Sequence, residues 1–369
     1  MNPIKISQGG KLETSSKIKV TQKNLAEVYT PGVAQVCLAI KKKPEKVRDL
    51  TWKNRSVAIV SDGTAILGLG NIGPEAGLPV MEAKALLFKQ LGGIDAVPIM
   101  LNTNNPKEII RTVKNIAAGF GGINLEDIAA PNCFQIEKAL RSLPIPAFHD
   151  DQDGTAIVTL AGLINATKVV GKNLKTTKII ISGAGAAGIA IARLLLAYGC
   201  KNITLFDSQG SIYQGRKGLN FIKKEIAQRT NLTKENLVLK KGIKEADIFI
   251  GVSGPKLLNI SDIRKMKERA IVFAMANPTP EIMPEIALKG GAAIVATGRS
   301  DFPNQINNAL VFPGIFKGAL KNEARAISQK HKLAAAISLS SLIKNPTKNN
   351  LLPKVTDRRA VEAVAKVFQ

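Results

Sequence analysis

The chain has 369 residues, 45% of them hydrophobic, so it is long and apolar enough for two globular domains and is not a disordered protein. Three widely spaced cysteines fit neither a disulfide framework nor a zinc cluster, which favours a reducing, cytoplasmic environment. The sequence starts without a signal-peptide pattern, and no stretch reaches the ~18 apolar residues of a membrane helix, so no membrane association is expected.

A formal net charge of +24 makes nucleic acid the first partner to consider. Aromatic residues are only 4% of the chain, however, so side chains that could stack on bases are scarce. The lysines are also spread along the chain. We therefore interpret the charge as a solvated surface that attracts anionic substrates, and nucleic-acid binding is not the favoured function.

The first half of the chain has the pattern of an α/β domain, expected at 1–153. Apolar runs at 56–62 and 95–101 predict buried strands. Between them, a glycine-rich loop at 65–79 leads to a helix expected from Pro79 to about Leu91.

The second half, 154–369, predicts another α/β unit. The segment 154–172 has helical periodicity and would join the two domains. Strands that alternate with helices are typical of a parallel sheet with right-handed crossovers. We expect these strands at 178–182, 202–207, 247–253, 270–276 and 292–297.

A glycine-rich turn opens this second unit. Gly183, Gly185 and Gly188 fit G-x-G-x-x-G, follow an expected strand and begin an expected helix. In such a turn the glycines allow the tight bend, the close approach of a pyrophosphate and the packing of helix on strand. The dinucleotide would therefore lie along the segment Gly183, Ala184, Gly185, Ala186, Ala187 and Gly188.

Asp207 ends the next expected strand, where it would accept hydrogen bonds from the adenosine ribose. A carboxylate there repels a 2′-phosphate, so NAD is favoured over NADP. Arg216 and Lys217 lie close enough in sequence to offset that repulsion, which leaves NADP open.

Two acidic doublets precede the glycine turn, Glu126-Asp127 and Asp150-Asp151. Paired carboxylates repel one another unless a cation lies between them, and hard oxygen ligands suit Mg²⁺ or Mn²⁺. Acidic residues at helix starts also serve simply as caps, which would explain one of these residues but not both doublets. His149 borders the second doublet, either as a ligand or as a packing neighbour.

Lys84 falls on an apolar helical stripe marked by Val80, Leu87 and Leu91. A lysine buried in this way loses proton affinity, and enzymes use such burial to bring a base to a pKa of ~7–8. The alternative is a side chain that only extends its stem across the edge of the core. Periodicity does not separate the two.

The chain resembles the malic enzyme family in its compact bacterial form, over nearly its whole length. The resemblance rests on five motifs in family order: YTPGVAQVC (29–37), VSDGTAILGLGNIGPEAGLPVMEAKALLFKQLGGID (60–95), FHDDQDGTA (148–156), AMANPTPEI (274–282) and NQINNALVFPGIFKGAL (304–320). It implies an N-terminal α/β substrate and catalytic domain at 1–153, followed by a Rossmann-type parallel-sheet NAD-binding domain with C-terminal helices at 154–369.

The resemblance also implies catalytic roles. Tyr29 would be the general acid that protonates an enolate, and Lys84 would take the hydroxyl proton of malate or tune Tyr29. Asp150 would set the charge state of Lys84. The residues implied to bind the metal are Glu126, Asp127 and Asp151, and those implied to hold nicotinamide or substrate are Asn277 and Asn308.

The implied reaction is the oxidation of L-malate to bound oxaloacetate, followed by loss of CO₂ and protonation to pyruvate. It would use NAD or NADP with Mg²⁺ or Mn²⁺, in at least a homodimer. Two alternatives remain from the residues: a dehydrogenase for another 2-hydroxy acid that keeps its CO₂, and a basic nucleic-acid-binding protein on an enzyme scaffold.

Four positions depart from the family pattern. Asp153 stands where bacterial members usually have histidine, and Gln35-Val36 replaces an expected Glu-Pro. Ala65 stands where the large animal and plant enzymes have a malate-binding arginine. The substrate carboxylate therefore needs another cation or a set of neutral donors in this chain.

Overall fold

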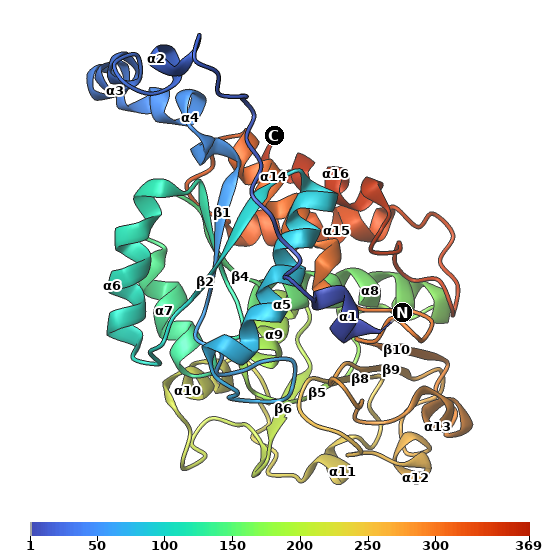
Figure 1. The fold of residues 1–369 in the computed structure, drawn as a ribbon. Helices are drawn as coiled ribbons and strands as arrows, with labels where there is room; N and C mark the ends of the chain where they lie inside the picture. The colour runs from blue at the N-terminus through green and yellow to red at the C-terminus, as the bar shows by residue number, and fades with distance from the viewer. Residues whose placement is uncertain (1) are drawn as a thin grey trace.

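The computed structural model describes residues 2–369, which form two parallel sheets with helices around and between them (Figure 1). The first sheet has the order β2-β1-β3-β4, and all its neighbours pair in parallel. Its strands are β1 (Ser56–Ser61), β2 (Asp95–Met100), β3 (Gly122–Leu125) and β4 (Ala147–His149). Each residue of β1 is buried, as an apolar run in the middle of a covered parallel sheet requires.

Three helices connect these strands: α5 (Pro74–Leu87), α6 (Pro106–Ile116) and α7 (Asn132–Leu140). The start of this helix expected from sequence, Pro79, is wrong. The helix begins at Pro74, and Pro79 lies inside it. The buried face also differs from the expected stripe. Gly77, Met81, Lys84 and Ala85 are buried, whereas Val80 and Leu87 are only partly covered.

The second sheet has the order β10-β9-β8-β5-β6-β7, with only the short β7 antiparallel. Its strands are β5 (Ile179–Ser182), β6 (Ile203–Asp207), β7 (Gly210–Ser211), β8 (Ile248–Gly251), β9 (Ile271–Ala274) and β10 (Ile294–Thr297). Its helices are α9 (Ala186–Tyr198), α10 (Phe221–Ala227), α11 (Leu239–Gly242), α12 (Ile260–Ile263) and α13 (Pro284–Lys289). The five strands expected from sequence are thus confirmed.

Helices near the middle and end of the chain tie the two sheets together. They are α8 (Thr155–Val170), α14 (Phe312–Lys321), α15 (Gln329–Ser341) and α16 (Arg358–Ala365). Helix α8 is buried along almost its whole length and packs against α9 and α15. In α14, the ring of Phe316 lies 5.5 Å from that of Phe88 and 6.0 Å from that of Phe148. The C-terminal helices therefore also cover the first sheet.

Residues 2–55 form an N-terminal arm that carries little of the core. Its helices are α1 (Pro3–Ser7), α2 (Leu25–Val28), α3 (Val33–Lys42) and α4 (Val47–Leu50), and none of them has a buried residue. Figure 1 shows α2, α3 and α4 projecting from one end of the molecule. Among the described residues, no helix is both long and apolar enough to cross a bilayer.

Each sheet has a point where the strand order reverses. In the first sheet the chain passes from β1 to β2 on one side and then to β3 on the other. In the second it passes from β5 to β6 and then to β8 across β5. Ligands of open α/β sheets bind beyond the carboxyl ends of the strands at such points. The fold therefore marks two positions for binding sites, after β1 and β3 and after β5 and β8.

Candidate active site

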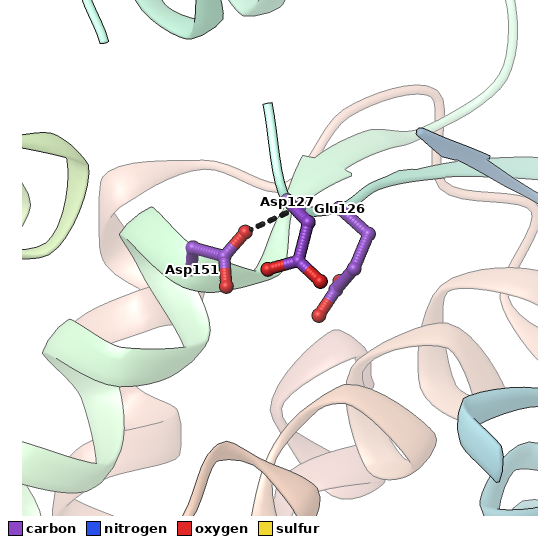
Figure 2. A group of neighbouring side chains, drawn as sticks. All are labelled: Glu126, Asp127 and Asp151. Atoms are coloured by element: carbon purple, nitrogen blue, oxygen red, sulfur yellow. Dashed lines mark hydrogen bonds between the residues drawn. The ribbon is translucent and has the colours of Figure 1, made fainter. Parts of the chain in front are cut away.

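Three carboxylates converge at the reversal point of the first sheet. Glu126 and Asp127 follow β3 directly, and Asp151 lies in η5 (Asp150–Gly154), a short π-helical turn that follows β4. One oxygen from each carboxylate lies within 4.8 Å of the other two. Figure 2 shows the three side chains pointing into the same space. The sequence doublets thus meet because adjacent parallel strands end at the same edge.

Backbone contacts hold this edge in place. Asp127 adopts a left-handed conformation, with φ of 52°, which is uncommon for a residue other than glycine. Its N–H donates to Asp151 Oδ2 at 2.7 Å, and its carbonyl accepts from the Ala65 N–H at 2.9 Å. The loop after β1 is fixed in turn by Thr64, which donates to Asp62 at 2.6 Å. An outlier held by several contacts is a common feature of functional sites.

Burial and mutual repulsion make these carboxylates hard to ionise. Burial is the main cause that raises the pKa of Asp127 to about 9, and the charges of Asp151 and Glu126 add to it. Burial likewise raises the pKa of Glu126 and Asp151. Asp127 Oδ2 is buried and has no hydrogen-bond partner among the described residues. Three hard oxygen donors with an unsatisfied lone pair suit a divalent cation such as Mg²⁺ or Mn²⁺.

Lys84 reaches the same edge from α5. Its side chain is only 7% exposed, so the alternative in which it merely crosses the edge of the core is wrong. Nζ donates to Glu126 Oε1 at 2.6 Å and to Asp150 Oδ2, and lies 4.2 Å from the centre of the Phe312 ring. Asn124 donates to the second oxygen of Glu126 at 2.9 Å.

The expectation of a lowered lysine pKa needs correction. Burial alone lowers the pKa of Lys84, but the charges of Asp150 and Glu126 outweigh it and hold the pKa above its ordinary value. Helical periodicity can indicate that a lysine is buried, but it does not indicate which charged groups surround the buried ammonium. Asp150 is itself fully buried, and burial holds its pKa well above the ordinary range despite the nearby ammonium.

Two asparagines approach from the second half of the chain. Asn308 lies beside η5, where a Cβ on Gly154 would come 3.2 Å from the Asn308 Cβ and would collide with Asp150 Oδ1. Asn277 is exposed in the loop after β9, and a Cβ on Gly68 would collide with its carbonyl oxygen. The glycine-rich loop of the first domain therefore lies directly on the Asn277 loop of the second.

The glycine turn lies at the reversal point of the second sheet. Gly183 has φ of 113°, and a Cβ there would lie 2.5 Å from the Val252 carbonyl, so only glycine fits between β5 and β8. A Cβ on Gly188 would collide with the carbonyl of Gly183, as expected for a glycine that lets the helix pack on the strand. Gly185 precedes the first residue of α9, which packs against η5. The helix that follows the glycine turn therefore packs against the segment that carries Asp151.

Asp207 ends β6 as expected, but it is already paired. Arg216 donates to both of its oxygens, at 2.9 and 2.5 Å, and Lys223 donates to it at 2.7 Å. Partial burial opposes ionisation, yet these two cations outweigh it and lower the pKa of Asp207 to about 2. Of the two offsetting cations considered from sequence, Arg216 contacts Asp207. Lys223, one helical turn into α10, was missed.

Tyr29 is the one expected catalytic residue that this chain does not bring to the site. It caps the C-terminus of α2 and is 68% exposed. The arm enters the fold at the amino end of β1, whereas the carboxylates lie beyond the carboxyl ends of the strands. Six strand residues separate those ends by ~20 Å. Tyr29 and Lys84 therefore do not meet within one chain.

Comparison with protein families agrees with the motifs. The malic enzyme N-terminal domain matches residues 9–141, and the malic enzyme NAD binding domain matches residues 152–367. The chain belongs to the malic enzyme family. The family match confirms the α/β and Rossmann-type fold class and gives no support to a dehydrogenase outside the family or to a nucleic-acid-binding protein.

Named relatives cover most of the chain. A bifunctional malic/malolactic enzyme of Bacillus subtilis is 53% identical over 98% of this chain and 89% of its own length. An NAD-dependent malic enzyme of Geobacillus stearothermophilus is 53% identical over 96% and 75%, and an NADP-dependent malic enzyme of Halomonas elongata is 46% identical over 93% and 82%. The crystal structure of an NAD-dependent malic enzyme from Thermotoga maritima superposes with a TM-score of 0.96, at 42% identity over 100% of this chain and 99% of that one.

The structure shows which groups surround Asp153, a departure from the malic enzyme pattern, and its neighbour His149. Asp153 pairs with Lys332 of α15 at 2.5 Å, so a cation of the C-terminal helices balances its charge. His149 is fully buried, and its Nδ1 lies 3.7 Å from Asp151 Oδ2. Burial lowers the pKa of His149 to about 4, so its imidazole remains neutral beside the acidic triad.

The raised pKa of Asp127 predicts a pH-dependent metal affinity. Below pH 9 this carboxyl is protonated without metal, and binding must displace the proton. We expect the affinity for Mn²⁺ to rise about tenfold per pH unit from pH 6.5 to 8.5, with one proton released. Calorimetry in buffers of different ionisation enthalpy measures both quantities. Asp127→Asn should weaken binding and abolish the slope, whereas the exposed control Asp49→Asn should not. An affinity independent of pH would contradict the prediction.

The ion pairs of Asp207 predict a switchable cofactor preference. Asp207→Ala removes the carboxylate and frees Arg216 and Lys223 for a 2′-phosphate, so the ratio of kcat/KM for NADP to that for NAD should rise at least about tenfold. Lys217→Gln is the matched control, because Lys217 is exposed and does not contact Asp207 in the structure. An unchanged ratio in Asp207→Ala would remove this residue from cofactor selection.

Proposed function

We propose that this protein catalyses the oxidative decarboxylation of L-malate to pyruvate and CO₂ with reduction of NAD or NADP, in the presence of Mg²⁺ or Mn²⁺. The observation that carries the proposal is the meeting of Glu126, Asp127 and Asp151 with the buried pair Lys84–Asp150. A dinucleotide turn lies next to this cluster. Oxygen ligands for a dication, a proton carrier and a hydride acceptor are what this chemistry requires.

The residues of the chain divide the work. Glu126, Asp127 and Asp151 would hold the dication, and the backbone of the glycine turn would hold the dinucleotide. When bound, these groups supply polarisation of the substrate oxygen and acceptance of hydride. Lys84 is positioned to exchange a proton with the substrate hydroxyl, and Asp150 orients its ammonium. Because neighbouring carboxylates raise the pKa of Lys84, neutralising their charge would lower it towards the range useful for a base.

The two halves of the chain would have different roles. Residues 1–153 would form the catalytic and metal-binding domain, and residues 154–369 the NAD-binding domain with its C-terminal helices. Asn277 and Asn308 would orient nicotinamide and substrate by uncharged hydrogen bonds, since Asn308 lies beside η5 and Asn277 lies against the glycine-rich loop of the first half. Three cysteines, all free, fit a cytoplasmic location.

A coupled assay tests the reaction. With malate and Mn²⁺, we expect NADH or NADPH to appear in equal amounts with pyruvate and CO₂. Removal of Mn²⁺ by a chelator, or Asp151→Asn, should lower kcat/KM at least about a hundredfold. Reduced dinucleotide without CO₂ would contradict the proposal.

A second reaction deserves measurement in the same assay. The Bacillus subtilis relative is named as both a malic and a malolactic enzyme. We therefore include the conversion of malate to lactate and CO₂ as a second candidate. Lactate formed with no net reduction of NAD would identify it.

We further propose that the protein is a homodimer in which Tyr29 acts in the site of the partner subunit. Tyr29 lies remote from Lys84 in its own chain, and the arm that carries it has no buried residue in its helices. Large apolar side chains of this arm are more than half exposed, namely Ile4, Ile6, Ile18, Val20, Tyr29 and Leu38. Such a surface is typical of an interface.

Mixing two inactive variants tests whether Tyr29 crosses subunits. Tyr29→Phe and Lys84→Ala should each lose activity alone. In a mixed dimer, the Tyr29→Phe chain keeps Lys84 and would receive Tyr29 from its partner. Random pairing makes half of the dimers mixed, each with one intact site, so about a quarter of the wild-type activity should return after co-refolding or subunit exchange. No recovery in mixtures shown to contain mixed dimers would mean that Tyr29 acts in its own chain or not at all.

A further inference from the structure

A second cavity lies between the two halves of the molecule, away from the acidic triad. Its walls are α7 of the first half and α9 and α10 of the second, and it measures about 530 Å³. That volume is within the range of small-molecule sites. Neither the acidic triad nor any residue of the glycine turn from Gly183 to Gly188 lines it.

The lining is positively charged. A narrow inner extension of about 50 Å³ shares Glu137, Arg141, Arg193 and Gln329 with the wider part. Across both parts the cations outnumber the acids: five cations (Lys138, Arg141, Arg193, Arg229 and Lys332) face three acids (Glu137, Glu225 and Asp153).

Each acid already has a cationic partner. Arg141 donates to Glu137 at 3.0 Å, Arg193 donates to Glu225 at 2.7 Å, and Lys332 pairs with Asp153. Lys138 and Arg229 have no ion pair among the described residues, and both are exposed at the wide end. The cavity therefore keeps two cations that its own acids do not neutralise.

A buried amide marks the inner end. Gln152 lines the narrow extension, is only 2% exposed, and its Nε2 has no hydrogen-bond partner among the described residues. A buried donor without an acceptor is costly, so such groups are normally satisfied by a partner or a ligand. The Gln152 side chain therefore lacks an acceptor at a position next to the inner end of the cavity.

We propose that this interdomain cavity binds a small polyanion that carries two or more carboxylate or phosphate groups. The guanidinium groups of Arg141 and Arg193 offer planar donors that match such groups, and Lys138 and Arg229 add two cations without ion pairs among the described residues. The occupant would touch both halves of the chain. It would also contact η5, the turn that carries Asp151.

The test measures binding and not catalysis. Tricarballylate and inorganic pyrophosphate are titrated separately into the full chain by calorimetry, with EDTA to remove metals and excess NAD to occupy the glycine turn. Arg193→Gln and Arg229→Gln are compared with Lys289→Gln, which removes the same charge from exposed α13 outside the cavity. We expect at least one anion to bind, with affinity at least about tenfold weaker in both arginine variants and unchanged in Lys289→Gln.

Each result of these titrations either supports or overturns the proposed anion site. Binding of only one anion tells whether the site prefers carboxylate or phosphate and supports the proposal. Absence of binding for both anions, or equal affinity in the wild type and both arginine variants, overturns it. If Arg193→Gln does not fold, because Arg193 also pairs with Glu225, then Arg229→Gln decides the matter. Failure here leaves the proposed malate chemistry intact, since no residue of the triad lines the cavity.

Discussion

The structure depends on keeping several like charges together out of water. Glu126, Asp127, Asp150 and Asp151 meet at one sheet edge, and among residues 2–369 only the ammonium of Lys84 contacts any of them with opposite charge. Burial raises the pKa of each of these carboxylates, and repulsion from neighbouring acids adds to it for Glu126, Asp127 and Asp150. Such an arrangement is poor for stability, because buried charges lose more in desolvation than one ion pair returns. A bound divalent cation, as proposed above, would offset this cost.

The fold makes this concentration of charge achievable. Parallel strands deliver their carboxyl ends to one edge, so residues far apart in sequence arrive together without long loops. The first sheet brings the triad there, and the second brings the glycine turn and the Asn277 loop. Contacts between Gly68 and Asn277, and between α9 and η5, fix the two edges against each other. The C-terminal helices close the arrangement through Phe316 and Phe312, whose rings pack against Phe88 and, for Phe312, also against Lys84.

Local patterns predicted much of this and missed what depends on distant partners. Some features can be recognised from a few consecutive residues, namely the glycine turn, the expected strands of the second sheet and the acidic doublets. The structure contains each of them at the expected position. The start of α5 was misjudged because Pro74 and Pro79 both suit the first turn of a helix, and sequence offers no way to choose. The pKa direction of Lys84 was misjudged because its partners come from two other strands. Lys223 was missed because it lies 16 residues after Asp207, at the start of helix α10, and only the fold brings the two together.

The position of Tyr29 has a consequence for how the protein behaves as it becomes dilute. If Tyr29 is the proton donor, as proposed, then a chain that carries it on an exposed arm, at the opposite end of the sheet from the carboxylates, does not complete the site alone. Turnover would then obey mass action between subunits, and specific activity would fall once the concentration drops below the dissociation constant of the pair. Catalytic competence would be a property of an encounter between two molecules and not of one folded chain.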